Sequence, residues 1–271
     1  MTLKILQLNI FQGKFLESVI DFVRKNNIDI LQFQEVTGGQ LSRGGVNQYL
    51  HIKSTPKSIN SDAIGVDCFE KIKSDLGYDG QISINFRIAG DLNSYLGNAI
   101  FYKNCELIKT QEIWLKNYQE YANPEAWDPV TTPRSCLSLQ LKKQGKLINF
   151  LNTHLAWGPT PEDEPYKLDQ AKILFDYVKT LNSSFIFSGD FNLNPHSQVI
   201  SWFNRIGKNL TEEHAIANTL NANVHIVEKL FPPGIAVDYV FTSHDIKVKS
   251  FRLVDDVDLS DHYGLLLEIE I

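Results

Sequence analysis

The 271-residue sequence has few cysteines, no surplus of positive charge and no long apolar run. Its three cysteines, Cys68, Cys105 and Cys136, are odd in number and widely spaced, so they form no metal-binding motif and indicate reduced thiols in the cytosol. No apolar stretch approaches the ~18 residues that would cross a bilayer, and the amino terminus lacks the apolar segment of a signal peptide. We therefore expect a cytoplasmic protein without a membrane span.

Positive charge is in the minority, with 26 Lys and Arg residues against 32 Asp and Glu residues and a formal net charge of −6. A protein whose main task is to coat DNA normally carries a basic surplus, because phosphate neutralisation dominates such binding. This charge balance argues against broad non-specific binding to DNA duplexes. It is compatible with a local basic groove. The apolar fraction of 43% is ordinary for a globular protein with a substantial core.

Hydrophobic periodicity predicts many short strands and a few amphipathic helices. Leu16, Val19, Ile20 and Val23 recur at the spacing of one helical face. Further helices are predicted over 66–76, 168–181 and 197–206. Strands are predicted over 3–8, 28–33, 81–88, 98–102, 106–115, 135–141, 147–152, 185–187, 237–242, 247–254 and 263–269. Long loops are predicted over 38–62, 116–133 and 156–165, and such loops in compact domains are usually functional or mobile.

The order of these elements predicts the architecture. The sequence shows no internal repeat and no linker that would separate two domains, so residues 1–271 are expected to form one domain. Many strands with short, mostly antiparallel-looking connections, interrupted by a few helices, favour two packed sheets with helices outside them. The predicted fold is therefore α/β, with two mostly antiparallel sheets flanked by helices.

Polar residues stand at the ends of the predicted strands. Asn9, Glu35, His154 and Asp190 come just after strands, and Asp238 and His262 come where strands begin. If the strands of the second group run antiparallel to those of the first, all of these ends meet at one edge of the sheets. The sequence therefore predicts one cleft that gathers carboxylates, amides and histidines.

The chemistry of this set favours a hard cation and a histidine base. An imidazole titrates near neutral pH, and a neighbouring carboxylate holds it in one tautomer. The oxygen ligands of Asn9, Glu35 and Asp261 suit Mg²⁺ or Mn²⁺, and the sequence lacks a Cys/His cluster with zinc spacing. A hard cation beside an Asp-backed histidine is what phosphoester hydrolysis needs.

Six short motifs, in order and spanning nearly the whole chain, resemble those of the endonuclease/exonuclease/phosphatase superfamily. They are Leu8-Asn9-Ile10 with Gly13, Gln34-Glu35-Val36, Asn152-Thr153-His154-Leu155, Ser188-Gly189-Asp190-Phe191-Asn192, Val237-Asp238-Tyr239 and Ser260-Asp261-His262. Each motif alone also fits an ordinary turn or strand end. Their conjunction favours the family, whose fold is a four-layer α/β/β/α sandwich.

The resemblance also implies roles for the residues at these positions. Asn9 and Glu35 would bind the divalent cation, with Asp261 near it. Asp190 would position or polarise the attacking water, and Asn192 would bind a phosphoryl oxygen.

Three further residues complete the set that the resemblance implies. His154 would donate to the phosphate, and His262, oriented by Asp238, would be a general base or an electrostatic stabiliser. Arg134, at the head of a predicted strand, has two open interpretations, as a contact for substrate phosphate or as a structural salt-bridge partner.

Three functions follow as hypotheses. The leading one is a Mg²⁺- or Mn²⁺-dependent phosphodiester hydrolase that uses in-line attack by water, with nucleic acid or a nucleotide-like ester as its candidate substrate. The alternatives are a phosphomonoesterase or lipid or inositol phosphate hydrolase, and a catalytically silent binding module. Nothing in the sequence indicates an obligate protein partner.

Overall fold

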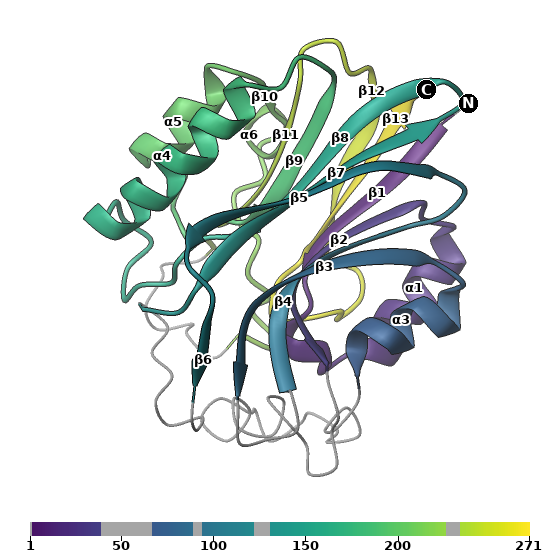
Figure 1. Cartoon of the computed structure of the whole chain (residues 1–271), viewed down its shortest axis with the longest axis horizontal. Coiled ribbons are helices and arrows are strands. Elements are labelled where there is room, and N and C mark those ends of the chain that lie inside the picture. Colours follow the sequence, from purple (N-terminus) through teal and green to yellow (C-terminus); the bar gives the residue numbers. More distant parts are fainter. Residues whose placement is uncertain (1, 39–66, 89–93, 122–130, 226–233) are drawn as a thin grey trace.

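The structure is a computed structural model that describes residues 2–38, 67–88, 94–121, 131–225 and 234–271. It is a four-layer α/β/β/α sandwich, as predicted from the sequence (Figure 1). The first sheet contains β12 (Val248–Val254), β13 (Gly264–Glu270), β1 (Thr2–Asn9), β2 (Ile30–Gly38), β4 (Ser94–Tyr102), β3 (Asp79–Ile88) and β6 (Gln119–Tyr121), in that order. The second contains β10 (Lys208–Asn209), β11 (Asp238–Thr242), β9 (Phe185–Asp190), β8 (Lys146–His154), β7 (Arg134–Lys143) and β5 (Glu106–Lys116).

Helices cover the outer face of each sheet (Figure 1). The first sheet carries α1 (Leu16–Asn26) and α3 (Cys68–Leu76), and the second carries α4 (Pro165–Lys179) and α5 (Gln198–Asn204). Two shorter helices, η1 (Phe11–Gly13) and α6 (Leu210–Glu213), follow strand ends. Helix boundaries have local causes: Asp67 caps α3 by accepting from the Glu70 N–H at 2.9 Å, and Gly77 ends it with φ of 66°.

Three apolar clusters separate the four layers. One lies between the two sheets, and one lies between each sheet and its helices. In β1, Ile5 packs between the sheets and Leu6 packs against the helices, because side chains alternate along a strand. The same two-residue period brings these polar residues onto the inter-sheet face: Gln7, Asn9, Gln34, Asn152, His154, Asp190 and Asp238.

The strand directions bring these residues to one end of the sandwich. In the first sheet β1 runs parallel to β2 and antiparallel to β13. In the second, β9 runs parallel to β8 and antiparallel to β11. The carboxyl ends of four strands therefore meet the amino ends of β11 and β13, as the sequence predicted.

Several predicted boundaries need correction. Glu35 lies inside β2 rather than after it, because the strand continues to Gly38 past a bulge between Phe33 and Val36. The predicted loop 116–133 contains β6, which pairs in parallel with β3. The two-residue strand β10 and the helix α6 were not predicted; both are too short to carry a periodic signal. Most of the predicted loop 38–62 lies outside the described residues.

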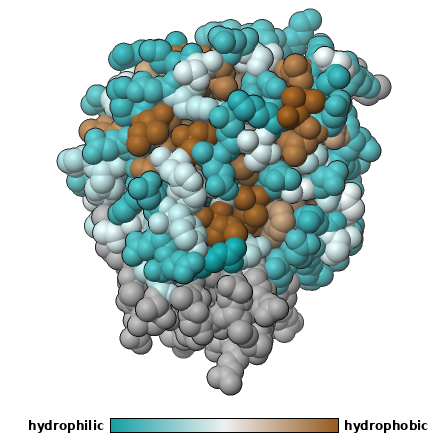
Figure 2. All heavy atoms as spheres, viewed as in Figure 1, coloured by the Kyte–Doolittle hydropathy of each residue, from teal (hydrophilic) through white to brown (hydrophobic). Residues whose placement is uncertain are grey.

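Two further expectations concern the membrane and the thiols. Within the ranges that the structure describes, no helix is both long and apolar enough to cross a membrane. Cys68, Cys105 and Cys136 form no disulfide. On the face viewed in Figure 2, apolar side chains lie in separate groups among hydrophilic ones.

Candidate active site

Asp190, the last residue of β9, lies at the centre of the predicted cleft. Its Oδ2 accepts a hydrogen bond from Nδ2 of Asn9 at 3.2 Å and lies 3.4 Å from Nε2 of His154 and 3.8 Å from Nε2 of His262. Its Oδ1 accepts from the backbone N–H of Asn192 at 2.9 Å. Burial raises the pKa of Asp190 to about 7, and the charge of nearby Asp238 adds to the rise. Asp190 therefore titrates near neutral pH.

Asp238 and His262 form a buried pair beside Asp190. Nδ1 of His262 lies 2.8 Å from Oδ2 of Asp238, so the imidazole donates from Nδ1 and turns Nε2 toward Asp190. Burial alone would lower the pKa of His262, but the carboxylates of Asp238 and Asp190 outweigh it and hold that pKa well above its usual value. The imidazole is consequently charged at neutral pH.

A backbone distortion turns Glu35 into the site. Its φ of 56° lies in the left-handed region that non-glycine residues rarely adopt, and it coincides with the bulge of β2. The carboxylate accepts from Nδ2 of Asn9 at 3.2 Å and from Nε2 of Gln12 at 3.3 Å. Such strain persists only where the surrounding structure enforces it, and it is common at functional sites.

Asp261 and Lys14 complete this oxygen-rich corner. Burial raises the pKa of Asp261 to about 6, and the charge of Glu35 adds to the rise. Lys14 is 5% exposed, and its Nζ has no hydrogen-bond partner among the described residues, although it lies 3.3 Å from the ring centre of Phe11. Burial lowers the pKa of Lys14 to about 8, although the charges of Asp261 and Glu35 oppose this.

His154 and Arg134 lie on the two strands that follow β9 in the second sheet. His154 is the last residue of β8, and Arg134 is the first residue of β7. Burial, with the positive charges of Arg134 and His262, lowers the pKa of His154 well below its usual value, so this ring is neutral. Arg134 is 3% exposed and forms no ion pair within 4 Å in the described part of the chain. Burial lowers the pKa of Arg134, and the opposing charges of Glu35 and Asp190 show that its guanidinium lies near these two carboxylates.

Asn192 follows Asp190 in a tight turn with φ of 52°. Its Nδ2 donates to the carbonyl of Leu155 at 3.1 Å, which leaves the second N–H of the carboxamide for a ligand. Its own carbonyl accepts from Nζ of Lys167 at 3.1 Å, and Lys167 also donates to the carbonyl of Thr160 at 2.9 Å. This buried lysine therefore ties the turn to the loop that precedes α4.

A series of amides connects the two sheets below the cleft. Gln7 donates to Oε1 of Gln34 at 3.1 Å, and Gln34 donates to Oδ1 of Asn152 at 2.6 Å. Asn152 then donates back across the interface to the carbonyls of Phe33 and Ala99, each at 2.8 Å. Because buried amides without partners are costly, this series fixes the position of one sheet on the other.

The structure brings every residue proposed from the sequence to this end of the sandwich. Sequence reasoning missed four others that lie among them: Gln7, Gln12, Lys14 and His225. Gln7 and Lys14 carried one available signal, since each interrupts an apolar or aromatic run next to the first motif. His225 carried none, because its neighbours come from a distant segment.

The amide and carboxylate donors fit a hard divalent cation. Asn9, Glu35 and Asp261 offer oxygen atoms, of which Oδ1 of Asn9 also accepts from the backbone N–H of Phe11 at 3.1 Å, and the charge of Glu35 acts on Asp261. Positive charge near these carboxylates comes from Lys14, from Arg134 beside Glu35 and from His262 beside Asp261. Burial is the main cause of the raised pKa of Asp261, and a cation here would relieve the repulsion from Glu35 that adds to it.

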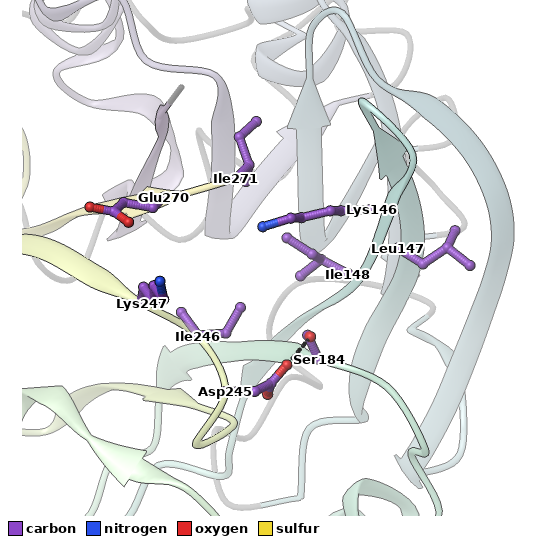
Figure 3. Close-up of a pocket in the computed structure, with 9 residues that line it drawn as sticks. All are labelled: Lys146, Leu147, Ile148, Ser184, Asp245, Ile246, Lys247, Glu270 and Ile271. Atoms are coloured by element: carbon purple, nitrogen blue, oxygen red, sulfur yellow. Dashed lines mark hydrogen bonds between the residues drawn. The ribbon is translucent and has the colours of Figure 1, made fainter.

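A separate cavity of about 330 Å³ lies at the other end of the sheets (Figure 3). Its lining includes Lys146 at the start of β8, Asp245 after β11 and Ile271 after β13. Ser184 donates a hydrogen bond to Asp245 on one wall. This cavity shares no residue with the cluster around Asp190.

Comparison with known proteins identifies the class. The family model described as the Endonuclease/Exonuclease/phosphatase family matches residues 6–262. No curated protein matches the chain. Solved structures with the same fold include an endonuclease/exonuclease/phosphatase from Bacteroides vulgatus, with 19% identity, a TM-score of 0.69 and coverage of 100% of this chain and 99% of that one.

Two other structures have names that specify an activity or a ligand. The mannosyl-6-phosphatase of Bacteroides thetaiotaomicron is 19% identical, with a TM-score of 0.68 and coverage of 99% of this chain and 100% of that one. TDP2 of D. rerio, complexed with a single-strand DNA product, is 12% identical, with a TM-score of 0.65 and coverage of 100% and 99%. These likenesses establish the fold.

The protein is an enzyme of the phosphoester hydrolase class. It belongs to the endonuclease/exonuclease/phosphatase family, because the family model covers nearly the whole chain, and this confirms the resemblance drawn from its six motifs.

Proposed function

We propose that the chain is a Mg²⁺- or Mn²⁺-dependent phosphodiester hydrolase in which water attacks phosphorus in line with the leaving oxygen. The observation that carries this proposal is the position of Asp190, whose Oδ2 lies 3.2–3.8 Å from nitrogens of Asn9, His154 and His262. A carboxylate ringed by donors can hold a water molecule and accept its proton while the donors contact phosphoryl oxygens. Both sheets supply these groups, so we treat residues 1–271 as one catalytic domain.

Asp190 is the proposed proton acceptor. A general base works best when its pKa lies near the working pH, and burial raises that of Asp190 to about 7. Its Oδ1 is held by the N–H of Asn192, which leaves Oδ2 to orient the water.

His262 is proposed to stabilise charge rather than to accept a proton. Its raised pKa favours the imidazolium at neutral pH, and the bond from Nδ1 to Asp238 aims the Nε2 proton into the cleft. A fixed positive group there stabilises the additional negative charge that develops on the phosphoryl group. Of the two roles left open by the sequence, this pKa supports the electrostatic one.

Three further donors are proposed to bind the other phosphoryl oxygens. His154 is neutral and can donate from Nε2, and Asn192 has one uncommitted N–H. Arg134 is buried near Asp190, and its Nε has no partner within the described ranges, which supports the phosphate-binding interpretation over a structural salt bridge.

Asn9, Glu35 and Asp261 are the proposed ligands of the cation. When bound, Mg²⁺ or Mn²⁺ supplies positive charge beside the phosphoryl oxygens. The carboxamide of Asn9 donates to both Glu35 and Asp190 and so keeps the two carboxylates in place.

The proposed substrate is a nucleic acid or a nucleotide-like ester. The same fold in TDP2 with a single-strand DNA product supports this class, whereas the same fold in a mannosyl-6-phosphatase supports the phosphomonoester alternative. Fold alone does not fix the substrate.

A substrate panel tests the proposal directly. The purified chain would be assayed with Mg²⁺ or Mn²⁺ on single- and double-stranded DNA, RNA, a 5′-tyrosyl ester, bis-p-nitrophenyl phosphate, p-nitrophenyl phosphate, inositol phosphates and sphingomyelin. We expect turnover of at least one diester that is lost in Asp190→Asn. Exclusive turnover of monoesters would favour the alternative, and DNA binding without any turnover would favour a silent binding module.

A further inference from the structure

His225 is held beside the catalytic histidine by a compact hydrogen-bonded turn. Its backbone N–H donates to the carbonyl of Asn221 at 2.7 Å. Asn221 in turn donates from its backbone to the carbonyl of Asp261 at 2.8 Å and from Nδ2 to that of Ser260 at 2.9 Å. The turn is thus fixed directly onto the segment that carries Asp261 and His262.

This arrangement brings two imidazoles and one carboxylate together. The rings of His225 and His262 lie edge to face, with centroids 5.9 Å apart and planes at 72°. One ligand atom from each of His225, Asp261 and His262 lies within 4.8 Å of the other two. In a tetrahedral zinc site, bonds of ~2.0–2.1 Å leave ligand atoms about 3.4 Å apart, so a contraction of at most about 1.4 Å brings these three atoms to zinc-binding separations.

The partner of His262 supports a ligand role. Nδ1 is engaged by Asp238 at 2.8 Å, so Nε2 carries whatever interaction the ring makes within the cleft. Histidines that bind metals almost always donate their other nitrogen to a carboxylate or carbonyl, which fixes the ring and raises its basicity as a ligand. Asp261 is buried, and the neighbouring carboxylate of Asp190 adds negative charge.

We propose that His225, Asp261 and His262 form a second cation site, specific for a borderline transition-metal ion such as Zn²⁺, and that its occupation inhibits the enzyme. Two nitrogen donors favour Zn²⁺ over Mg²⁺, which prefers an all-oxygen shell. The site was invisible in the sequence, because His225 lies far from Asp261 and His262 along the chain and no zinc spacing results.

Inhibition follows from the residues that the two sites share. Zn²⁺ would occupy Nε2 of His262, which then has no proton for a phosphoryl oxygen, and it would draw Asp261 away from the Mg²⁺ ligands. This consequence rests on the proposed function. The binding of the metal does not.

Cobalt titration tests binding without any substrate, because Co²⁺ in a low-coordinate nitrogen and oxygen site absorbs visible light and is readily replaced by Zn²⁺. We expect the chelator-treated protein to bind one Co²⁺ with this absorption, and stoichiometric Zn²⁺ to abolish it. His225→Gln should weaken binding at least tenfold, whereas the control His244→Gln, which changes an exposed histidine, should bind like wild type. Asp238→Asn should weaken binding ~10–100-fold, as loss of a supporting carboxylate does.

Two results would overturn the site: absence of the cobalt spectrum in wild type, or equal affinity in wild type and His225→Gln. For inhibition, each variant is compared with its own Mg²⁺-supported rate, and half-maximal inhibition of His225→Gln should need at least tenfold more Zn²⁺. Equal inhibition of both proteins, or hydrolysis supported by Zn²⁺ at this site, would contradict the inhibitory role. If no substrate is hydrolysed, the proposed function fails while the cobalt titration still decides the metal site.

Discussion

Gln7 of the first sheet donates a hydrogen bond of 3.0 Å to Oδ1 of Asp238 in the second sheet, 231 residues away in sequence. The other oxygen of Asp238 engages His262 at 2.8 Å. Both carboxylate oxygens are therefore committed, one to an amide and one to the imidazole. The position of His262 consequently depends, through Asp238, on the buried amide of Gln7.

Gln7→Ala tests this dependence, with Gln32→Ala as a matched control. Gln32 is equally buried on the next strand but donates to the carbonyl of Leu151, remote from Asp238. Both changes should lower the free energy of unfolding by ~1–3 kcal/mol, because each leaves a buried polar partner unsatisfied. Only Gln7→Ala should also lower kcat, by about tenfold, and shift the pH profile. Equal kcat losses in the two variants would make the role of Gln7 purely structural.

Asp238 and His262 should behave as one catalytic unit. His262→Ala and Asp238→Ala should each lower kcat by ~10²–10⁴, the range for a positioned acid–base or charge-stabilising group. The double variant should be little worse than either single one, because groups that act together are non-additive. Strictly additive losses in a double-mutant cycle would show that the two act separately.

The pH profile of kcat/KM should be bell-shaped. The proposed mechanism needs the ionised carboxylates of Asp190 and Asp261, whose pKa values burial raises to about 7 and about 6, so the rate should rise through this range. It should fall again when His262 loses its proton, above the usual histidine range. Added Mg²⁺ should move the acidic limb to lower pH, since a cation favours ionised carboxylates. A single limb rising near pH 6.5 would instead make His262 the base.

Asp190→Asn should stabilise the metal-free protein while it abolishes activity. Burial raises the folded pKa of Asp190 from 3.8 to about 7, so the folded state binds the proton more tightly than the unfolded state does. The contribution of this group to the free energy of unfolding therefore declines as pH rises from about 4 to 7. Urea unfolding in chelator should give the variant a gain of ~1–2 kcal/mol at pH 8, which shrinks at pH 5. Asp176→Asn, at an exposed site, should show no such gain.

Removal of the cation should abolish turnover reversibly, and Glu35→Gln should raise the Mg²⁺ concentration for half-maximal rate by at least tenfold. The reason is the loss of a charged oxygen ligand. Glu17→Gln, which changes an exposed carboxylate on α1, serves as the control. Full hydrolysis in excess chelator, or unchanged metal titrations in Glu35→Gln, would remove the cation or Glu35 from the mechanism.

Much of the site could be predicted because hydrophobic periodicity locates the strands in the sequence, and antiparallel pairing then determines which strand ends meet. Asn9 and His154 stand at the ends of apolar runs, and antiparallel pairing brings the starts of β13 and β11 to the ends of β1 and β9. Glu35 was different. A bulge adds one residue without changing composition, so the pattern ended the strand at the point where it bends.

The residues that escaped prediction have roles that depend on tertiary contacts. Gln7 resembles an ordinary polar residue of a strand until β11 is packed opposite it. Lys14 and Lys167 are buried, although lysines are almost always exposed and a sequence alone therefore predicts them at the surface. His225 lies near Asp261 because a turn at Asn221 is hydrogen-bonded to Asp261, and no sequence pattern predicts this contact between distant segments.

The amide series of Gln7, Gln34 and Asn152 fixes the position of the two sheets relative to each other, which apolar packing alone would not do. Apolar contact is non-directional and tolerates sliding, whereas directional hydrogen bonds in series do not. A slip of one residue, about 3.3 Å, would break the whole series and carry Asn9 away from Asp190. The rate of turnover therefore reports on the alignment of the two sheets. Mild denaturant or pressure should abolish activity while the strands and helices are still intact.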